Sequence, residues 1–176
     1  MRRERILQTE RLVLTSWVSS DVDELCAVHS DPDTMRFVRH GRPETREETA
    51  ALVDQYIAEQ RDSGYTKWRL ADVEGRLVGR AGFGRDRQGR QLAYTIRREH
   101  WGYGLATEIA TALVDWHLVH AATTPLYALV ATENPASRRV LAKTGFQTLG
   151  SEEHSGVPCE LLGLRPQSPS MARRQP

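Results

Sequence analysis

The segment REHWGYGLATEIATALVDW, residues 98–116, places two glycines directly in front of an apolar run with helical spacing. A short strand pattern, residues 92–96, precedes the segment, and a second one, residues 126–131, follows the helical run. A helix between two strands predicts a β-α-β unit, in which the crossover is right-handed and the strands are parallel. This unit commits the chain to the α/β class, with at least one parallel strand pair in a mixed sheet.

The remaining patterns predict further strands and helices on both sides of this unit. Two helix starts are marked by capping signals: Thr45 with Glu48 in one case, and Asn134 followed by Pro135 in the other. The predicted elements are strand 11–17, helix 20–29, helix 45–64, two strands within 67–84, strand 92–96, helix 105–119, strand 126–131, helix 134–145, and strands near 147–152 and 160–164. We expect a mostly antiparallel mixed sheet flanked by about four helices.

The composition is that of an ordinary soluble protein, with 39% apolar residues, 27% charged residues and a net charge of +1. A chain of 176 residues suffices for one domain, which we place at residues 1–165, with 166–176 as a mobile tail. Apolar runs fall short of the roughly 20 residues of a membrane span. The two cysteines lack the spacing of metal ligands. We expect a cytoplasmic protein without a metal, a membrane or a nucleic acid as partner.

Gly102 and Gly104 stand at a helix start, where unpaired N–H groups and the absence of a Cβ suit a phosphate. A Walker A loop needs a lysine in GxxxxGK, and the two lysines of the chain, Lys67 and Lys143, lie elsewhere. A dinucleotide fingerprint needs GxGxxG or GxGxxA, and the spacing up to Ala106 is one residue too short. A nicotinamide-dependent oxidoreductase stays as an alternative, and a glycine turn that only packs the helix explains one glycine better than two.

Five segments, in order, resemble the GNAT superfamily of N-acetyltransferases and its Rim-like branch, the ribosomal-protein N-terminal acetyltransferases: QTERLVLTSW, DPDTMRFV, RPETREET, WGYGLATE and NPASRRVLAKTGF. WGYGLATE is similar to the family's pyrophosphate-binding pattern Gln/Arg-x-x-Gly-x-Gly/Ala, with Trp101 in the Gln/Arg position. The similarity covers residues 7–164. It implies a GNAT-type fold with a central pair of parallel strands that splay apart, and acetyl-CoA as the co-substrate held between them.

The resemblance also implies which residues bind acetyl-CoA. Backbone groups around Thr95, Ile96 and Arg97 would meet the pantetheine amides, and the amides of residues 102–107 would cradle the pyrophosphate at the positive end of the helix dipole. Arg97, Arg98, Arg138 and Arg139 either reach the 3′-phosphate or adenine or are solvated surface residues. The predicted cofactor-binding set is Ile96, Arg97, Trp101, Gly102, Tyr103, Gly104, Leu105, Ala106, Thr107, Asn134 and Ser137.

For the chemistry, the resemblance implies direct attack of a neutral amine on the thioester, with a backbone N–H near Ile96 as oxyanion donor. Many members protonate the leaving thiolate with a Tyr in the helix that follows the second splayed strand, and Leu141 occupies that position here. The Rim-like branch instead has Asn and Ser at the start of this helix, matched by Asn134 and Ser137. Ser137 is therefore our candidate donor or water-orienter, and the alternative is a plain N-cap followed by a surface serine.

The general base is harder to place. Family members often carry a Glu in a segment like ELGY, and here the segment is QLAY, so that Gln91 offers an amide that cannot take a proton. Either water relays the proton to another group or the amine arrives neutral. The candidate groups are Glu160, Glu133, His40 and Tyr94, and we select Glu160, in the final hairpin. The missing base also fits a degenerate member that binds acyl-CoA without catalysis.

We predict an acetyl-CoA-dependent N-acetyltransferase that acts on a primary amine, in the first place the N-terminal α-amino group of a protein. A small-molecule acetyltransferase for antibiotics or polyamines is one alternative, and a strongly acidic acceptor site would favour it. A non-catalytic acyl-CoA-binding regulatory module is another. Residues 20–64 and the hairpin at 152–160 would hold the acceptor. Because members of the branch often pair, a homodimer is among the expected states.

Overall fold

The computed structural model describes residues 3–86, 89–154 and 156–164. The elements are β1 (Arg5–Gln8), β2 (Leu12–Thr15), η1 (Ser19–Asp21), α1 (Val22–His29), α2 (Pro32–Met35), α3 (Arg46–Ser63), β3 (Lys67–Asp72), β4 (Leu77–Asp86), β5 (Gly89–Ile96), η2 (Arg98–His100), α4 (Leu105–Ala121), β6 (Leu126–Ala131), α5 (Pro135–Lys143), β7 (Phe146–His154) and β8 (Val157–Leu164). The predicted tail, residues 166–176, lies outside the described residues.

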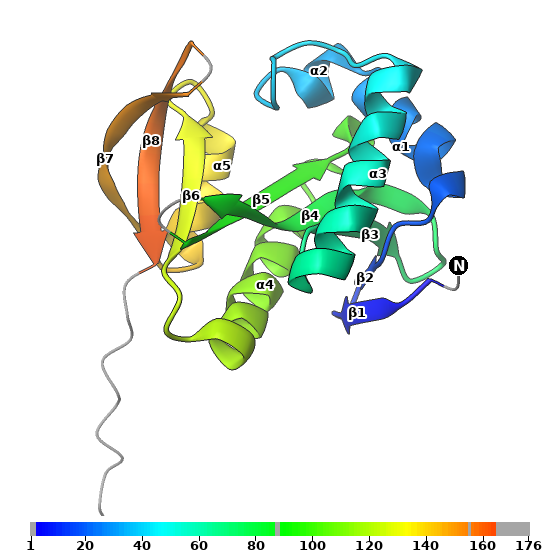
Figure 1. Cartoon of the computed structure of the whole chain (residues 1–176). Coiled ribbons are helices and arrows are strands. Elements are labelled where there is room, and N and C mark those ends of the chain that lie inside the picture. The colour runs from blue at the N-terminus through cyan, green and yellow to red at the C-terminus, as the bar shows by residue number, and fades with distance from the viewer. Residues whose placement is uncertain (1–2, 87–88, 155, 165–176) are drawn as a thin grey trace, which may run out of the picture.

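The strands form one eight-stranded mixed sheet with the order β1-β2-β3-β4-β5-β6-β8-β7 (Figure 1). All neighbours are antiparallel except β5 and β6, which are parallel and pair only at Arg90 with Leu126 and at Gln91 with Tyr127. Beyond these two pairs the strands run apart, as Figure 1 shows. The predicted β-α-β unit and its splayed parallel pair are therefore confirmed.

Helices cover both faces of the sheet (Figure 1). α4 packs Ile109 and Leu113 into the larger apolar core, which Leu141 of α5 joins. On the opposite face, Leu25 of α1 and Val53 of α3 belong to a second cluster. Because side chains alternate along a strand, each residue of the sheet faces either α4 and α5 or α1 and α3.

The capping signals mark the helix ends correctly. Thr45 and Glu48 form the predicted capping box of α3, which ends at Gly64 with a left-handed φ of 74°. The Asn134 side chain accepts a hydrogen bond from the Ser137 N–H at 3.1 Å at the start of α5. The edge strand β1, whose apolar residues Ile6 and Leu7 are adjacent instead of alternating, and the short turns α2 and η2 were not predicted.

The helices within the described ranges are all too short or too polar to cross a membrane.

Candidate functional site

The splay between β5 and β6 leaves backbone groups of β5 facing a gap. The Arg97 N–H donates to the Val78 carbonyl on β4 at 2.9 Å. Because successive peptide groups of a strand point to opposite edges, those of Tyr94 and Ile96 face away from β4 and toward β6. The β6 register ends at Gln91, so neither residue has a β6 partner among the described strand pairs. The gap can therefore accept an extended ligand that pairs with β5 as an added strand.

This register corrects the prediction for the neighbouring residues. Both backbone groups of Arg97 are already used, because its carbonyl also accepts from the His100 N–H at 3.0 Å. Thr95 pairs with β4 in the antiparallel ladder. The contacts predicted for the backbone of Thr95 and Arg97 therefore pass to Tyr94 and Ile96, and Arg97 stays a predicted cofactor residue through its guanidinium alone.

Trp101 fixes the end of β5. Its indole Nε1–H donates to the Ile96 carbonyl at 2.7 Å, while half of the residue's surface remains exposed. The bond occupies the carbonyl of Ile96 and leaves the N–H of that residue at the mouth of the gap. Where the family pattern has Gln or Arg, this side chain thus holds the turn that leads to Gly102.

The glycine turn forms a cradle at the start of α4. Gly102 and Gly104 have left-handed φ values of 85° and 78°. A Cβ on Gly102 would meet no atom within 4 Å, and one on Gly104 would meet only the Arg11 Nη2 at 3.8 Å. The first α-helical bond runs from the Glu108 N–H to the Gly104 carbonyl, and no side chain caps the helix. The N–H groups that precede this bond, and that suit an anion, belong to Leu105, Ala106 and Thr107.

The cradle is braced by the N-terminal segment. The Glu108 carboxylate accepts from the Thr9 hydroxyl at 2.5 Å and from the Arg11 Nε at 2.7 Å, and the Arg11 Nη1 donates to the Tyr103 carbonyl at 2.9 Å. The segments QTERL and WGYGLATE are each recognisable in the sequence, but their contact was not predicted, because Arg11 and Glu108 are 97 residues apart in the chain. The one feature of the sequence that could have indicated the contact is the opposite charge of Arg11 and Glu108. The brace satisfies the Arg11 charge and leaves the backbone amides to a ligand.

At the base of α5, Tyr94 meets the residues that sequence analysis selected for the leaving group. The Tyr94 and Ser137 hydroxyl oxygens are hydrogen-bonded at 2.8 Å, and Asn134 caps the same turn. Burial raises the pKa of Tyr94 to about 12, and its bond to Ser137 offsets part of that rise. Tyr94 therefore stays protonated and can donate to Ser137, whose own hydroxyl proton is then free to point elsewhere.

Glu160 lies on the sheet face that α5 covers. Its carboxylate is 3.2 Å from the Nε of Arg138 on α5 and accepts from the Thr148 hydroxyl at 3.5 Å. The arginine predicted for a cofactor phosphate and the carboxylate predicted as base thus form an ion pair with each other. Gln91 shares the opposite face with Tyr56 of α3, as the contacts of Lys67 show. Glu160 stays a prediction as the base, and the structure places it away from Gln91.

The other predicted candidates are dispersed. Glu133 and His40 are exposed, and so is Arg139. Arg98 forms an ion pair with Asp33 of α2. In the described parts of the chain, no three His, Cys, Asp or Glu side chains lie close enough together to hold a metal ion.

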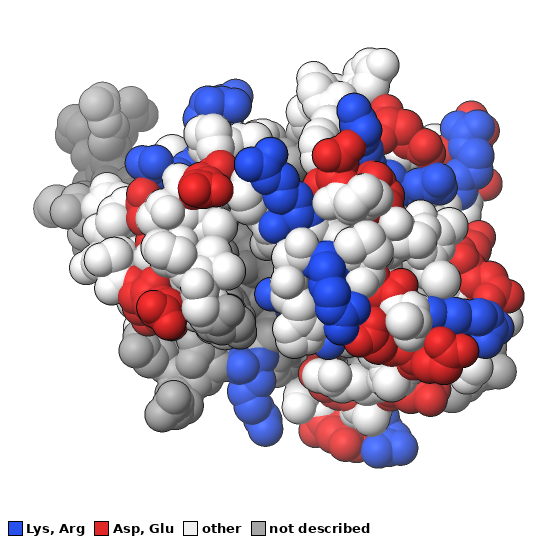
Figure 2. Space-filling model, turned by 90° about the horizontal axis from the view of Figure 1, so that it is seen from above, with Lys and Arg blue, Asp and Glu red and all other residues white. Residues whose placement is uncertain are grey.

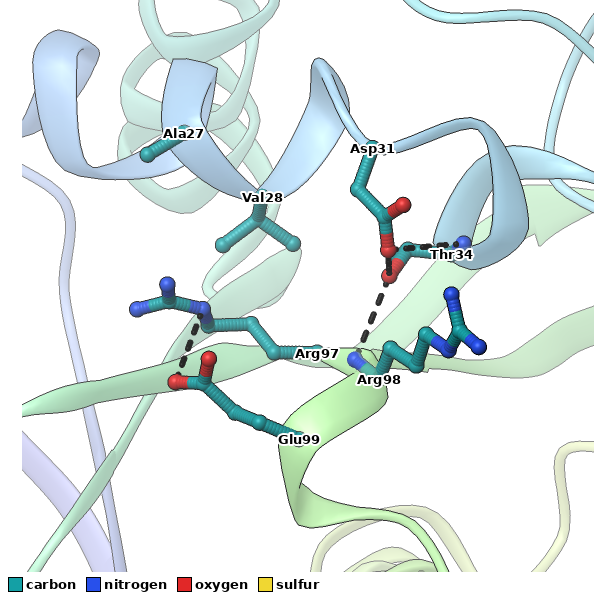
Figure 3. Close-up of a pocket in the computed structure, with 7 residues that line it drawn as sticks. All are labelled: Ala27, Val28, Asp31, Thr34, Arg97, Arg98 and Glu99. Atoms are coloured by element: carbon teal, nitrogen blue, oxygen red, sulfur yellow. Dashed lines mark hydrogen bonds and ion pairs between the residues drawn. The ribbon is translucent and has the colours of Figure 1, made fainter.

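A cavity of about 450 Å³ lies between the first helices and the segment that precedes the cradle. Figure 3 shows α1 and α2 on one side of the cavity and Arg97, Arg98 and Glu99 on the other. The Arg98 N–H donates to the Thr34 hydroxyl at 3.2 Å, so α2 is tied to the segment that leads into the cradle. Seen from above in Figure 2, basic side chains lie along the middle of the molecule, while acidic and basic side chains are mixed on the side that carries α1 and α3 in Figure 1. The basic middle suits an anionic ligand.

A buried polar network joins α1 to the sheet. The Arg80 Nε donates to the Nε2 of His29 at 3.3 Å, so the other ring nitrogen, Nδ1, carries the proton and donates to Glu44 at 2.8 Å. Arg39 forms an ion pair with Glu44. Burial, together with the Arg80 charge, lowers the pKa of His29 to about 4. His29 is therefore neutral at physiological pH.

This network should make the protein sensitive to acid. Between pH 6.5 and about 4 the unfolded state binds a proton at His29 that the folded state does not, so stability should fall as the pH falls through this range. The pKa difference corresponds to a loss of about 3 kcal/mol. Denaturant unfolding of the wild type and His29→Asn, whose amide can still donate to Glu44, measures it. Between pH 6.5 and about 4, the free energy of unfolding should fall less steeply with decreasing pH in the variant than in the wild type. Equal slopes in the two proteins would contradict the assignment of a neutral, buried His29.

Comparisons with known proteins agree with this geometry. The model of the acetyltransferase (GNAT) domain family matches residues 11–147. YoaA of Bacillus subtilis (strain 168), an uncharacterized N-acetyltransferase, is 27% identical over 149 residues, which make up 82% of this chain and 84% of YoaA. The structure of RimL, a ribosomal L7/L12 alpha-N-protein acetyltransferase, in complex with coenzyme A has a TM-score of 0.79 at 17% identity and covers 91% of this chain and 97% of its own. Spermidine N-acetyltransferase from Vibrio cholerae, in complex with CoA and spermine, has a TM-score of 0.71 at 17% identity and covers 88% and 95%.

Proposed function

This chain belongs to the GNAT family of acetyltransferases, and we propose that it transfers the acetyl group of acetyl-CoA to the N-terminal α-amino group of a peptide or protein. One observation supports the assignment of acetyl-CoA as cofactor. The gap between β5 and β6 leaves room for an added strand beside β5, and the glycine cradle lies at the open end of this gap. The extended pantetheine arm fits the gap, and the pyrophosphate fits the cradle. Membership of the Rim-like branch stays a prediction, because a spermidine acetyltransferase shares the fold as well.

The charge near the closed end of the gap supports an α-amino group over a polyamine. Lys67 and the buried Arg80 lie on the α3 face there. Among the described residues, the charged groups around Tyr56 are three cations, Lys67, Arg80 and Arg39, against two carboxylates, Glu44 and Glu59. A net positive acceptor site repels a polycation, whereas an α-amino group carries one charge and loses it at a pKa of about 8.

Each group of site residues would have its own role in the proposed acetyl transfer. The α4 amides would hold the pyrophosphate, and the gap-facing groups of Tyr94 and Ile96 would align the arm. The Tyr94 N–H, which lies nearer the closed end of the gap than the predicted Ile96 N–H, would be the oxyanion donor. Acetyl-CoA, when bound, supplies the activated acyl carbon. The Tyr94–Ser137 pair would deliver a proton to the departing thiolate.

The direct test is thiol release from acetyl-CoA with a panel of N-terminal peptides, spermidine and an aminoglycoside. Peptides should be acetylated at the α-amino group, as mass spectrometry would show. Turnover restricted to spermidine or the aminoglycoside would contradict the acceptor assignment. Acetyl-CoA binding without any turnover would identify a regulatory module, and stabilisation by a nicotinamide cofactor alone would refute the cofactor assignment.

Replacing Ser137 by alanine should lower kcat by about 10²-fold, the lower end of what proton transfer from a positioned side chain contributes. The acetyl-CoA Kd should change by less than about threefold, since the Asn134 cap and the α4 amides remain. Glu160→Gln, measured in parallel, tests the predicted base: it should lower kcat if Glu160 takes the proton and leave kcat unchanged if the base lies on the opposite face, with Gln91. Ser151→Ala, on the exposed strand β7, is the control for both. An unchanged kcat in the Ser137 variant would remove this residue from the proposed relay.

A further inference from the structure

The closed end of the gap carries a basic side chain. Gln91 marks the last pairing of β5 with β6, and it pairs with Gly84 on β4. A Cβ on Gly84 would lie 3.1 Å from the Lys67 Nζ and 3.5 Å from the Gln91 Oε1. The Lys67 Nζ also lies 5.8 Å from the ring centre of Tyr56 on α3. The ends of the Lys67 and Gln91 side chains therefore both lie over Gly84 on the α3 face, and this glycine has no side chain to separate them.

If the proposed function holds, this is also where the thioester would lie. The cradle fixes the pyrophosphate beyond the carboxyl end of β5, so an arm that pairs along the strand runs back toward Gln91, where β6 closes the gap. The opposite face beneath β5 is filled by core side chains, among them Leu92 and Ile109. The acceptor amine must then approach from the α3 face, beside Lys67.

We propose that Lys67 accepts the proton that the acceptor amine loses as it attacks the thioester. The inference rests on the proposed function and supplies the base that Gln91 cannot provide. The Gln91 amide oxygen points to the same space over Gly84, and after a side-chain adjustment it could accept a hydrogen bond from the resulting ammonium group.

The groups that face Lys67 keep part of it neutral. Burial, followed by the charge of Arg80 on β4, lowers the pKa of Lys67 to about 8. Glu59 of α3 acts in the opposite direction and accepts a hydrogen bond from the Thr66 hydroxyl at 2.6 Å. Arg39, which adds to the lowering, is paired with Glu44. About half of Lys67 is then neutral at pH 8, near the optimum for a proton acceptor at physiological pH.

The step balances without a further reactant. The amine nitrogen forms a bond to the acyl carbon with its lone pair, and its surplus proton moves to the Lys67 Nζ. The carbon–sulfur bond then breaks, and the sulfur takes a proton from the Ser137 hydroxyl, which solvent restores through Tyr94. Lys67 returns its proton to solvent, so one amide and one thiol are formed from one amine and one thioester.

Kinetics of Lys67 variants test the proposal. Lys67→Arg, which keeps the charge but cannot release its proton, and Lys67→Gln should each lower kcat/KM by about 10²- to 10⁴-fold. The same substitutions at Lys143, the other lysine, are matched controls that should leave kcat/KM within about threefold. Circular dichroism and thermal unfolding check that the variants fold. Retention of wild-type kcat/KM by either Lys67 variant would overturn the proposal.

The pH profile separates a base from a structural lysine. Wild-type kcat should rise with pH and level off above about 8, with the same midpoint for acceptor peptides of differing amine pKa. A purely structural lysine would lower activity in the variants without removing this ionisation. Persistence of the same midpoint in Lys67→Gln would therefore overturn the proposal, and its loss would support it.

A measurement independent of activity completes the test. With lysine labelled at 13Cε, the two lysines give two NMR signals, which the Lys67→Arg variant assigns. The Lys67 signal should titrate near pH 8, and titration above about pH 10 would overturn the inference. Absence of wild-type turnover on every amine would overturn the proposed function and this inference with it, whereas peptide turnover with unaffected Lys67 variants would overturn the inference alone.

Discussion

Alanine at Gly104 should weaken acetyl-CoA binding by at least about 100-fold, equivalent to about 2.7 kcal/mol, while lowering protein stability by only about 1 kcal/mol. Gly104 has a φ of 78°, which an alanine adopts at a modest energetic cost. Its Cβ would enter open space, with the Arg11 Nη2 the nearest atom at 3.8 Å. Gly104 directly precedes the N–H groups of residues 105–107, where a pyrophosphate would have to approach. The added methyl group would therefore displace the ligand and leave the packing of the free protein intact.

Gly64, at the end of α3, provides the matched control. It has a φ of 74°, and a Cβ there would meet no atom within 4 Å, so Gly64→Ala imposes the same backbone strain at a place with no proposed ligand. Isothermal titration with acetyl-CoA should give wild-type affinity for this variant, and denaturant unfolding should give similar losses of stability for both. Equal acetyl-CoA affinities in the two variants would mean that the glycine turn only packs α4 against β5.

The cradle could be predicted from sequence because its requirements are local. Two glycines, a helix start and an apolar helix face all fall within residues 98–116, and each is set by neighbours along the chain. The capping signals at Thr45 and Asn134 worked for the same reason. Tertiary packing had no part in these features, so local rules sufficed.

Features that depend on register escaped prediction. Which of Ile96 and Arg97 offers its backbone to the gap is decided by the pairing of β5 with β4, and a one-residue change exchanges the two edges. The same applies to the faces on which Glu160 and Gln91 lie. The brace between Arg11 and Glu108 and the shared position of Lys67 and Gln91 on the α3 face join distant segments, and only the assembled sheet brings them together.

The sheet that assembles this site should not tolerate a side chain at Gly82. This residue pairs with Lys67 on β3 and with Ala93 on β5, and its φ of 149° is one that side chains rarely adopt. A Cβ there would lie 2.1 Å from the Thr66 carbonyl oxygen, which is backbone and cannot move without breaking the ladder. Gly82→Ala should therefore lower the free energy of unfolding by more than about 4 kcal/mol.

Gly84, two residues further along β4 and on the same face, provides a control that shows whether the backbone contact at Gly82 causes the loss of stability. Its φ lies outside the left-handed region, and its Cβ would press only on the Lys67 Nζ, the end of a flexible side chain, at 3.1 Å. Gly84→Ala should lose less than about 1 kcal/mol in denaturant unfolding, because only the lysine tip has to shift. Comparable losses at the two positions would mean that the backbone contact at Gly82 is not the cause of its effect. A large loss at Gly82 alone would show that the closed end of the gap depends on the close approach of β3 to β4.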